Sequence, residues 1–374
     1  MSKLNPPFRA DHVGSFLRSP AIVSARALHA KGMLSDAELT AVEDKEIKLL
    51  IEKELQHGLQ AVTDGEYRRS FWHLDFLAAL TGIEHIKAKA WSVQFKDAAP
   101  KAETIRIVDK IAFPENHPFI EHFVRLQNLA GEAMVKFTIP SPSMLHLICC
   151  VRAENYAPIA YYKDNEEQLY ADIAAAYCQC IDLLYAKGCR YLQLDDTSWG
   201  EFCSAEKRAT YKERGFDLDA IAAKYVGMIN TIMAHKKPDM TICMHICRGN
   251  FRSTWFSSGG YEPVAQELFG NCHIDGFFLE YDSDRAGDFK PLRFIQDQTV
   301  VLGLVTSKTP ELESLALIKE RVAEATQYVP LEQLCLSTQC GFASTEEGNN
   351  LTEAQQWAKV DLVVQAAKAI WADA

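Results

Sequence analysis

Thr241-Ile-Cys-Met-His-Ile-Cys-Arg-Gly-Asn250 is a run of strand-forming residues that ends in two soft metal ligands, His245 and Cys247. In a β-strand the side chains of residues i and i+2 leave the same face, and the backbone rises ~3.3 Å per residue. The imidazole and the thiol can therefore close on one ion. The pattern predicts a zinc site that takes further ligands from elsewhere in the chain.

Two further candidate ligands end other apolar runs. Glu280 follows Gly276-Phe-Phe-Leu, and Cys340 follows Leu334-Cys-Leu-Ser-Thr-Gln. The alternative interpretation is that these are core residues, because cysteine is among the most buried residue types and a strand histidine is often a hydrogen-bonded core residue. Cys243 fits the core best. It lies four residues from Cys247, roughly 13 Å along a strand, so the two thiols cannot bind one ion.

The composition favours a globular protein that acts on small molecules. The chain has 374 residues, of which 48% are hydrophobic and 24% charged, so it can bury a sizeable core. Its net charge of -11 argues against a nucleic-acid partner and against an anionic membrane surface, since both reward a basic face.

The cysteines and the N-terminal segment favour a cytoplasmic location. The eleven cysteines are an odd number and are scattered, which is not the pattern of a disulfide framework. Met-Ser-Lys-Leu-Asn-Pro-Pro at positions 1–7 has no apolar core of a signal peptide. No apolar run reaches the ~20 residues of a membrane span.

Short β-rich runs alternate with amphipathic stretches, a pattern that predicts a parallel sheet covered by helices. The eight β-rich runs are 8–13, 60–64, 135–139, 191–195, 241–247, 276–281, 299–305 and 334–339. The helical stretches are 36–56, 167–187, 217–234, 311–327 and 352–372. We therefore expect one α/β domain over residues 1–374, a (β/α)8 TIM barrel. Residues 81–116, which include Trp91, Val93 and Phe95, are expected to form a β-ribbon insertion after the second strand.

The barrel makes the metal prediction more specific, because active sites of such barrels lie at the C-terminal ends of the strands. His245, Cys247, Glu280 and Cys340 occupy the ends of the fifth, sixth and eighth predicted strands. Strands of a barrel bring these ends to one mouth, so the four side chains are expected to meet there.

Several motifs in chain order resemble the catalytic barrel of the cobalamin-independent methionine synthase family. The opening Arg-Ala-Asp-His-Val-Gly-Ser segment at positions 9–15 resembles the short, single-barrel branch of that family. The resemblance implies a methyltransferase in which His245, Cys247, Glu280 and Cys340 surround a zinc ion that binds the sulfur of homocysteine. It also implies that homocysteine is methylated to methionine.

The resemblance also assigns the amino-acid end of the substrate. It implies that Val13, Gly14 and Ser15 hold the carboxylate, and that Glu66 and Asp195 hold the ammonium in the catalytic site. Glycine lets backbone N–H groups approach a carboxylate, and two carboxylates suit an ammonium. The alternatives are an acidic cap at positions 195–196 and a surface ion pair of Glu66 with Arg68 or Arg69.

The sequence departs from folate-dependent members of the family at two places. It has no tryptophan shortly after the third strand, and Lys308 stands after the seventh strand where those members have a histidine for proton transfer. Lys308 either substitutes for that histidine or is a surface charge. The methyl donor, a partner protein that delivers it and the oligomeric state, a homo-oligomer included, stay open.

Three other functions compete. A related zinc enzyme of the coenzyme M type would alkylate another thiol. A uroporphyrinogen decarboxylase-like barrel would need no metal, and so would not need His245, Cys247, Glu280 and Cys340 together. A structural zinc protein would enclose its ion in four ligands without a neighbouring pocket.

Overall fold

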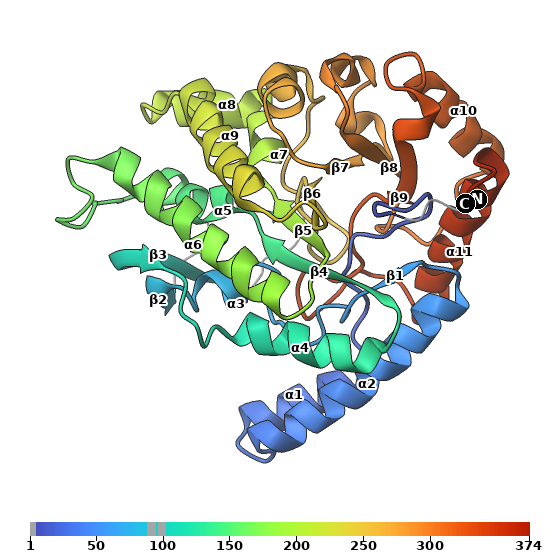
Figure 1. Ribbon diagram of the computed structural model, residues 1–374, viewed down its shortest axis with the longest axis horizontal. Coiled ribbons are helices and arrows are strands. Elements are labelled where there is room, and N and C mark those ends of the chain that lie inside the picture. Colours follow the sequence, from blue (N-terminus) through green and yellow to red (C-terminus); the bar gives the residue numbers. More distant parts are fainter. Residues whose placement is uncertain (1–4, 88–94, 96–101) are drawn as a thin grey trace.

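A parallel sheet of seven strands curls into a TIM-like barrel at the centre of the computed structural model, which describes residues 5–87, 95 and 102–374 (Figure 1). In spatial order the strands are β1 (Ala61–Val62), β4 (Met134–Pro140), β5 (Tyr191–Asp196), β6 (Thr241–Ile246), β7 (Gly276–Glu280), β8 (Thr299–Val305) and β9 (Leu334–Thr338). Nearly every strand residue is buried, as expected when helices cover a parallel sheet.

Helices surround the sheet on its outer face (Figure 1). The long ones are α1 (Pro20–Ala30), α2 (Asp36–Gln56), α4 (Pro118–Ala130), α6 (Glu166–Ala186), α9 (Leu218–His235), α10 (Leu315–Ala325) and α11 (Glu353–Ile370). Shorter helices are α3 (Leu74–Leu77), α5 (Pro142–His146), α7 (Ser198–Phe202) and α8 (Ala205–Glu213), with π-helical turns η1 (Leu147–Arg152) and η3 (Gln266–Gly270). Four 3-10 turns are also described: η2 (Glu262–Val264), η4 (Asp284–Ala286), η5 (Lys290–Phe294) and η6 (Leu331–Gln333).

The sequence places the ends of several helices. Ser35 and Thr352 each form a capping box with the residue three positions on, which satisfies backbone N–H groups at the start of α2 and α11. The five predicted helices are present with small shifts at their ends. Of the long helices, α1 and α4 were not predicted; α1 buries only Ile22 and Ala25, so its apolar pattern is weak. The short helices were not predicted either.

The first predicted strand, 8–13, is not a strand, and this part of the prediction is wrong. The segment makes one parallel bridge to β9, through Ala10 and Leu336, and a second bridge joins Ser15 to Gly65 after β1. It is held mainly by side chains, since Lys136 donates to Asp11 and to the backbone carbonyl of His12. The segment therefore fills the space between the two edge strands without a regular ladder.

The predicted insertion after the second strand is supported by an antiparallel pair. Strands β2 (Thr81–Lys87) and β3 (Glu103–Ala112) pair with each other and not with the barrel sheet, and β3 lies against α6. Trp91 and Val93 lie outside the described residues. Phe95 is described, and its ring contacts Phe251 and Phe256.

The barrel interior holds its own small core, and Cys243 belongs to it as expected. The buried members of this core are Phe8, Val13, Ala61, Tyr191, Cys243, Phe278, Val301 and Cys335. All eleven cysteines have free thiols. Among the described residues, no helix combines the length and the apolar character that a membrane crossing requires.

Candidate metal centre and adjoining pocket

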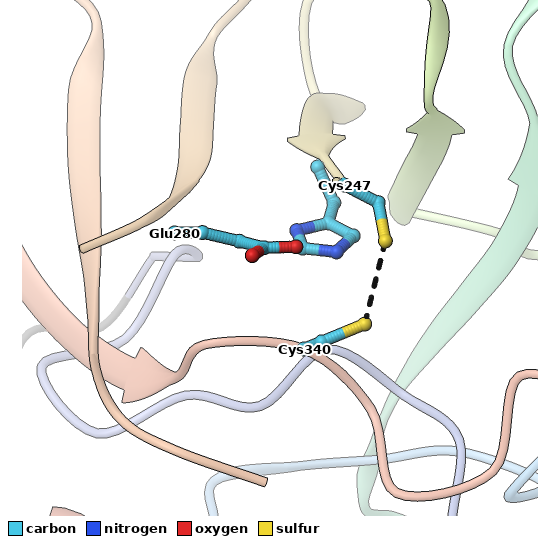
Figure 2. Close-up of side chains that lie close together, drawn as sticks. Cys247, Glu280 and Cys340 are labelled. Carbon is cyan, nitrogen blue, oxygen red and sulfur yellow. Dashed lines mark hydrogen bonds between the residues drawn. The ribbon is translucent and has the colours of Figure 1, made fainter. Parts of the chain in front are cut away.

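Four buried side chains converge where β6, β7 and β9 end. His245 lies in β6, Cys247 directly follows that strand, Glu280 is the last residue of β7, and Cys340 comes two residues after β9. One ligand atom from each lies within 4.8 Å of the others. Figure 2 shows the two sulfur atoms pointing toward one another, with the Glu280 carboxylate directed into the same space. The sequence predicted this group in full.

The two cysteine sulfurs form a close pair. Their Sγ atoms are 3.6 Å apart, and the backbone N–H of Gly249 donates to Cys247 Sγ over 3.3 Å. The hydrogen bond from the Cys247 thiol, opposed by burial and helped by the nearby His245 ring, holds the pKa of Cys340 well below its ordinary value. The same hydrogen bond raises the pKa of Cys247. The pair thus favours one thiolate, the form that binds metals.

The other two candidate ligands are oriented by neighbours behind them. Glu280 Oε1 accepts from the backbone N–H of Arg248 at 2.8 Å, and Oε2 accepts from the Arg285 guanidinium at 3.1 Å. His245 Nδ1 is 3.3 Å from the Phe278 carbonyl, which can only accept a hydrogen bond. Nδ1 therefore carries a proton, and Nε2 is the ring atom that is left to bind a metal. Buried Nε2 has no hydrogen-bond partner among the described residues.

This donor set fits a metal ion. Two soft sulfurs, one borderline imidazole nitrogen and one hard carboxylate oxygen make four donors, the number that a tetrahedral site uses. The orientation of His245 through its second nitrogen and of Glu280 through Arg248 and Arg285 is typical of the groups that surround metal ligands in proteins. The orphaned Nε2 atom is the observation that most directly calls for a metal.

A pocket adjoins this group. Its lining residues are Val13, Ser15, Glu66, Phe71, Trp72, His73, Phe95, Arg152, Asp195, Thr197, His245, Cys247, Gly249, Asn250, Phe251, Phe256, Cys340, Gly341, Ser344 and Thr345. Three of the four candidate metal ligands are among them. Glu280 is not, and lies fully buried behind the others. An ion held there would therefore face the pocket on one side.

Four of the five residues assigned to substrate binding line the pocket: Val13, Ser15, Glu66 and Asp195. Gly14 does not line it, but it turns the backbone between Val13 and Ser15 with a φ of 122°. A Cβ at this position would lie 2.8 Å from a methyl group of Thr138, so a side chain has no room. Glycine here lets the segment bend into the pocket.

Glu66 faces the pocket from a strained loop. Its φ is 61°, and its Oε1 accepts from Thr138 Oγ1 at 3.1 Å and lies 3.4 Å from the Arg69 guanidinium. Its Oε2 is buried without a hydrogen-bond partner in the described part of the chain, and burial raises the pKa of Glu66. The ion pair with Arg69 exists, but it is buried and not at the surface. It leaves one carboxylate oxygen available to a ligand.

The two acids at the end of β5 have different tasks. Asp196 caps the following helix α7, since its Oδ1 accepts from the backbone N–H groups of Ser198 and Trp199. Asp195 lines the pocket instead, and its Oδ1 accepts from Gln193 at 2.7 Å. Burial, opposed by His245 and reinforced by the negative charge of Glu66, raises the pKa of Asp195 to about 7. The capping interpretation therefore holds for Asp196.

Lys308 is neither a surface charge nor a residue of the pocket. It is buried, and its ammonium donates to Asn250 Oδ1 at 2.9 Å and to the Gly249 carbonyl at 3.3 Å. The surface interpretation is wrong, and the ammonium serves to hold the loop that follows Cys247.

The sequence analysis missed the aromatic lining of the pocket. Phe71, Trp72 and His73 come from the loop after β1, and Phe251 and Phe256 come from the loop after β6. The one signal available was the Phe-Trp-His run at positions 71–73, close behind Glu66. Which way such a run faces depends on tertiary contacts, here the hydrogen bond from Trp72 N–H to the Ser344 carbonyl.

A TIM-like barrel that carries a metal-binding group, two buried carboxylates and a pocket at its strand ends has the organisation of barrel enzymes. A family model described as the catalytic domain of cobalamin-independent synthase matches residues 8–369. The uncharacterized protein YxjH of Bacillus subtilis (strain 168) is 47% identical over 367 residues, 98% of this chain and 95% of that protein.

Solved structures agree. A putative vitamin-B12 independent methionine synthase from Listeria monocytogenes is 44% identical, with a TM-score of 0.77 over 98% of both chains. A B12-independent methionine synthase from Shewanella sp. W3-18-1, solved in complex with selenomethionine, shares the fold at 16% identity, with a TM-score of 0.71 over 97% of both chains. The chain belongs to the cobalamin-independent synthase family and is a methyltransferase.

Proposed function

We propose that this protein is a zinc-dependent thiol methyltransferase that converts homocysteine to methionine, and that the described barrel is one catalytic unit. His245, Cys247, Glu280 and Cys340 would hold the zinc ion. The observation that carries the proposal is the convergence of these four donors within 4.8 Å, beside a pocket that also contains Glu66 and Asp195. Zinc is favoured over harder ions because half of the donors are thiolates.

When bound, zinc lowers the pKa of a coordinated thiol, so that the thiol is a thiolate at neutral pH and can attack a methyl carbon. Two cysteinates and a glutamate make such a centre electron-rich. That charge favours a nucleophilic thiolate over the activation of water. The residues of the chain position the donors, and the mostly apolar lining of the pocket excludes water.

The amino-acid end of homocysteine would lie against Glu66, Asp195 and the 13–15 segment. The free Oε2 atom of Glu66 and the Asp195 carboxylate can accept hydrogen bonds from an ammonium. An ammonium between them would also relieve the repulsion that helps to raise the pKa of Asp195. The Ser15 side chain accepts from the backbone N–H of Ala343 at 3.2 Å, which fixes this segment at the pocket wall.

These carboxylates weigh against a coenzyme M type of thiol, whose sulfonate would meet two acids in place of a cation. The metal-free decarboxylase alternative leaves the orphaned His245 Nε2 without a purpose. A purely structural zinc site does not account for the adjoining pocket. The eleven free thiols favour a reducing compartment such as the cytoplasm, where thiols stay reduced.

X-ray absorption at the zinc edge tests the proposal directly. The zinc-loaded protein should show two sulfur ligands, and homocysteine should raise the number to three. Homoserine, which lacks the sulfur, is the matched control and should leave the spectrum unchanged. An unaltered coordination shell in saturating homocysteine would contradict the proposed role.

A further inference from the structure

The pocket wall beside the metal-binding group is aromatic, and none of the assignments above uses it. Phe71 and Trp72 contribute one part from the loop after β1, and Phe251 and Phe256 contribute another from the loop after β6. Phe71 and Phe251 are almost fully buried, whereas Trp72 and Phe256 are half-buried. Trp72 and Phe256 are therefore the rings that a second substrate entering the pocket would meet.

The ring of Phe256 packs against a glycine in the loop that carries Cys247. A Cβ at Gly249 would lie 2.2 Å from the Phe256 ring, and the φ of Gly249 is 93°. The ring therefore packs on the backbone two residues beyond Cys247. An aromatic face so close to the sulfur centre suits a group that lies next to the reacting thiol.

The charges around the pocket favour a cation over an anion, because two carboxylates face the single ammonium that the proposed function places between them. Glu66, Asp195 and two cysteines line it, whereas Arg152 is the one arginine, and no lysine is found, among the described lining residues. Arg152 is already paired, because its Nε donates to Glu201 at 2.9 Å and its guanidinium also donates to Thr197 Oγ1 at 3.0 Å. Lys308 is held away by Asn250. In the described part of the lining, a polyanionic donor would therefore meet only the paired guanidinium of Arg152; the Lys207 ammonium lies 5.2 Å from the centroid of the Phe256 ring but does not line the pocket.

Lys308, which in one of the two interpretations of the sequence would replace the proton-transfer histidine, does not supply a proton to the pocket. Lys308 does not line the pocket, and burial together with Arg152 lowers the pKa of His73 to about 3, so the His73 imidazole is neutral near pH 7. The two lining acids, Glu66 and Asp195, are both assigned to the ammonium of homocysteine by the proposed function. A methyl donor that departs as a basic nitrogen would therefore lack a proton source among the described residues that line the pocket. A donor that already carries a positive charge leaves as a neutral molecule and needs none.

We propose that the methyl donor is a small methyl-onium compound, a sulfonium or a quaternary ammonium, whose charged methyl groups lie against Trp72 and Phe256. This inference rests on the proposed function and names its second substrate. Aromatic faces bind such cations through the negative charge of the π-system, and desolvation in a pocket strengthens the attraction.

The reaction balances without a further reactant. The lone pair of the homocysteine thiolate forms the new sulfur–carbon bond, the bond between the methyl carbon and the onium atom breaks, and its electron pair stays on that atom. A thiolate and a cation become two uncharged groups, a thioether and either a second thioether or a tertiary amine. Charge is neutralised in a pocket of low polarity, which favours the step over its counterpart in water.

The test uses the zinc-loaded full chain, homocysteine and four methyl donors: S-methylmethionine, glycine betaine, and 5-methyltetrahydrofolate with one or three glutamates. Methionine carrying the donor methyl group is measured by mass spectrometry with a carbon-13 label. We expect labelled methionine from S-methylmethionine or glycine betaine, and the two arms separate a sulfonium from an ammonium. Labelled methionine from the folates alone overturns the inference while leaving the proposed function intact.

If none of the four donors reacts, a binding measurement tests the inference. Calorimetry with trimethylsulfonium should show binding to the zinc-loaded protein, weakened about tenfold by Trp72→Leu or Phe256→Leu and largely restored by Trp72→Phe. Tyr161→Leu removes an exposed ring elsewhere and should change nothing. Zinc content and homocysteine affinity should be the same in all variants. If trimethylsulfonium does not bind, the inference is overturned. If homocysteine does not bind to the zinc-loaded wild type, the proposed function is overturned.

Discussion

The sulfur atoms of Cys247 and Cys340 lie 3.6 Å apart although 93 positions separate them in the sequence. Each follows the end of a barrel strand, β6 or β9, and those strands are not neighbours in the sheet. The two thiols therefore meet in the space between these strand ends, next to His245 and Glu280. A metal bound here would connect three strands of the sheet, so its loss should affect the strand ends as a group.

Cys340→Ser should remove most of the zinc from the purified protein. The substitution replaces a soft thiolate by a hydroxyl that is not deprotonated at neutral pH, so one of four ligands is lost. Elemental analysis of protein purified without added metal measures the effect, with about one zinc per chain expected in the wild type. Cys243→Ser is the matched control, because Cys243 lies in the barrel interior and outside the metal group. Full zinc in the Cys340 variant would show that the ligand assignment is wrong.

Asp195→Asn should weaken homocysteine binding by at least about tenfold and leave zinc content unchanged. The amide retains the shape but loses the charge that an ammonium requires, and a charge-assisted hydrogen bond is worth roughly 1.5–3 kcal/mol. Isothermal calorimetry with homocysteine on zinc-loaded protein measures the change. Mercaptoethanesulfonate, a thiol without an ammonium, should bind no more weakly to the variant, because the substitution removes a carboxylate that faces its sulfonate. Tighter binding of this sulfonate than of homocysteine to the wild type would favour the coenzyme M type of enzyme.

Gly200→Ala should weaken metal binding by displacing the backbone of Cys247. A Cβ at Gly200, in α7, would lie 2.3 Å from the backbone carbonyl oxygen of Cys247, so helix and ligand must move apart. We expect zinc affinity to fall by about tenfold or more, as for other groups that position metal ligands. A competition titration with a chelating dye measures it.

Gly227→Ala provides the control for that substitution. Gly227 lies in α9, and a Cβ there meets no atom within 4 Å. Alanine favours a helix interior over glycine, so this variant should be about 0.5–1 kcal/mol more stable in urea unfolding, with unchanged zinc affinity. Equal effects of the two substitutions on zinc would contradict the packing argument.

Much of the architecture could be predicted because its signals are local. Continuous apolar runs mark the buried strands, and the spacing of His245 and Cys247 puts both side chains on one side of a chain that ends at the barrel mouth. Segment 8–13 could not be predicted correctly, since its backbone follows the buried Lys136 ammonium, 124 residues away from His12. Side chains from distant elements, not strand propensity, set its path.

In the site, too, the features set by local sequence were predicted and those set by distant contacts were not. The metal group and the two acids lie at strand ends or shortly after them, where the sequence analysis placed them, whereas the orientation of the surrounding loops was not predicted. Lys308 looked available in the sequence, yet Asn250 and the Gly249 carbonyl hold its ammonium. The aromatic wall depends on contacts between loops, such as the packing of Phe256 on Gly249, and no periodicity reports these.

Low pH should destabilise the folded protein because buried histidines are held in their neutral form. The effect of one such histidine, His117, can be measured separately. Its Nε2–H donates to the Phe76 carbonyl at 3.1 Å, and its Nδ1 accepts from the backbone N–H of Phe119 at 3.3 Å, which caps α4. The neutral ring satisfies both partners, and protonation of Nδ1 would remove the cap. Burial, partly offset by the Phe76 carbonyl, lowers the pKa of His117 from 6.5 to about 4.

The direction in which pH changes the stability follows from the protons that the chain takes up when it unfolds. Between pH 6.5 and about 4 the unfolded chain protonates this ring and the folded protein does not, so stability is fully present above pH 6.5 and declines as the pH falls. By pH 5 the loss is roughly 2 kcal/mol. Urea unfolding of wild type and His117→Gln at several pH values measures it, because contributions from other groups cancel in the difference. The wild type should be the more stable at pH 7.5, and the gap should narrow toward pH 5. A gap that stays constant over this range would mean that His117 is not held in its neutral form.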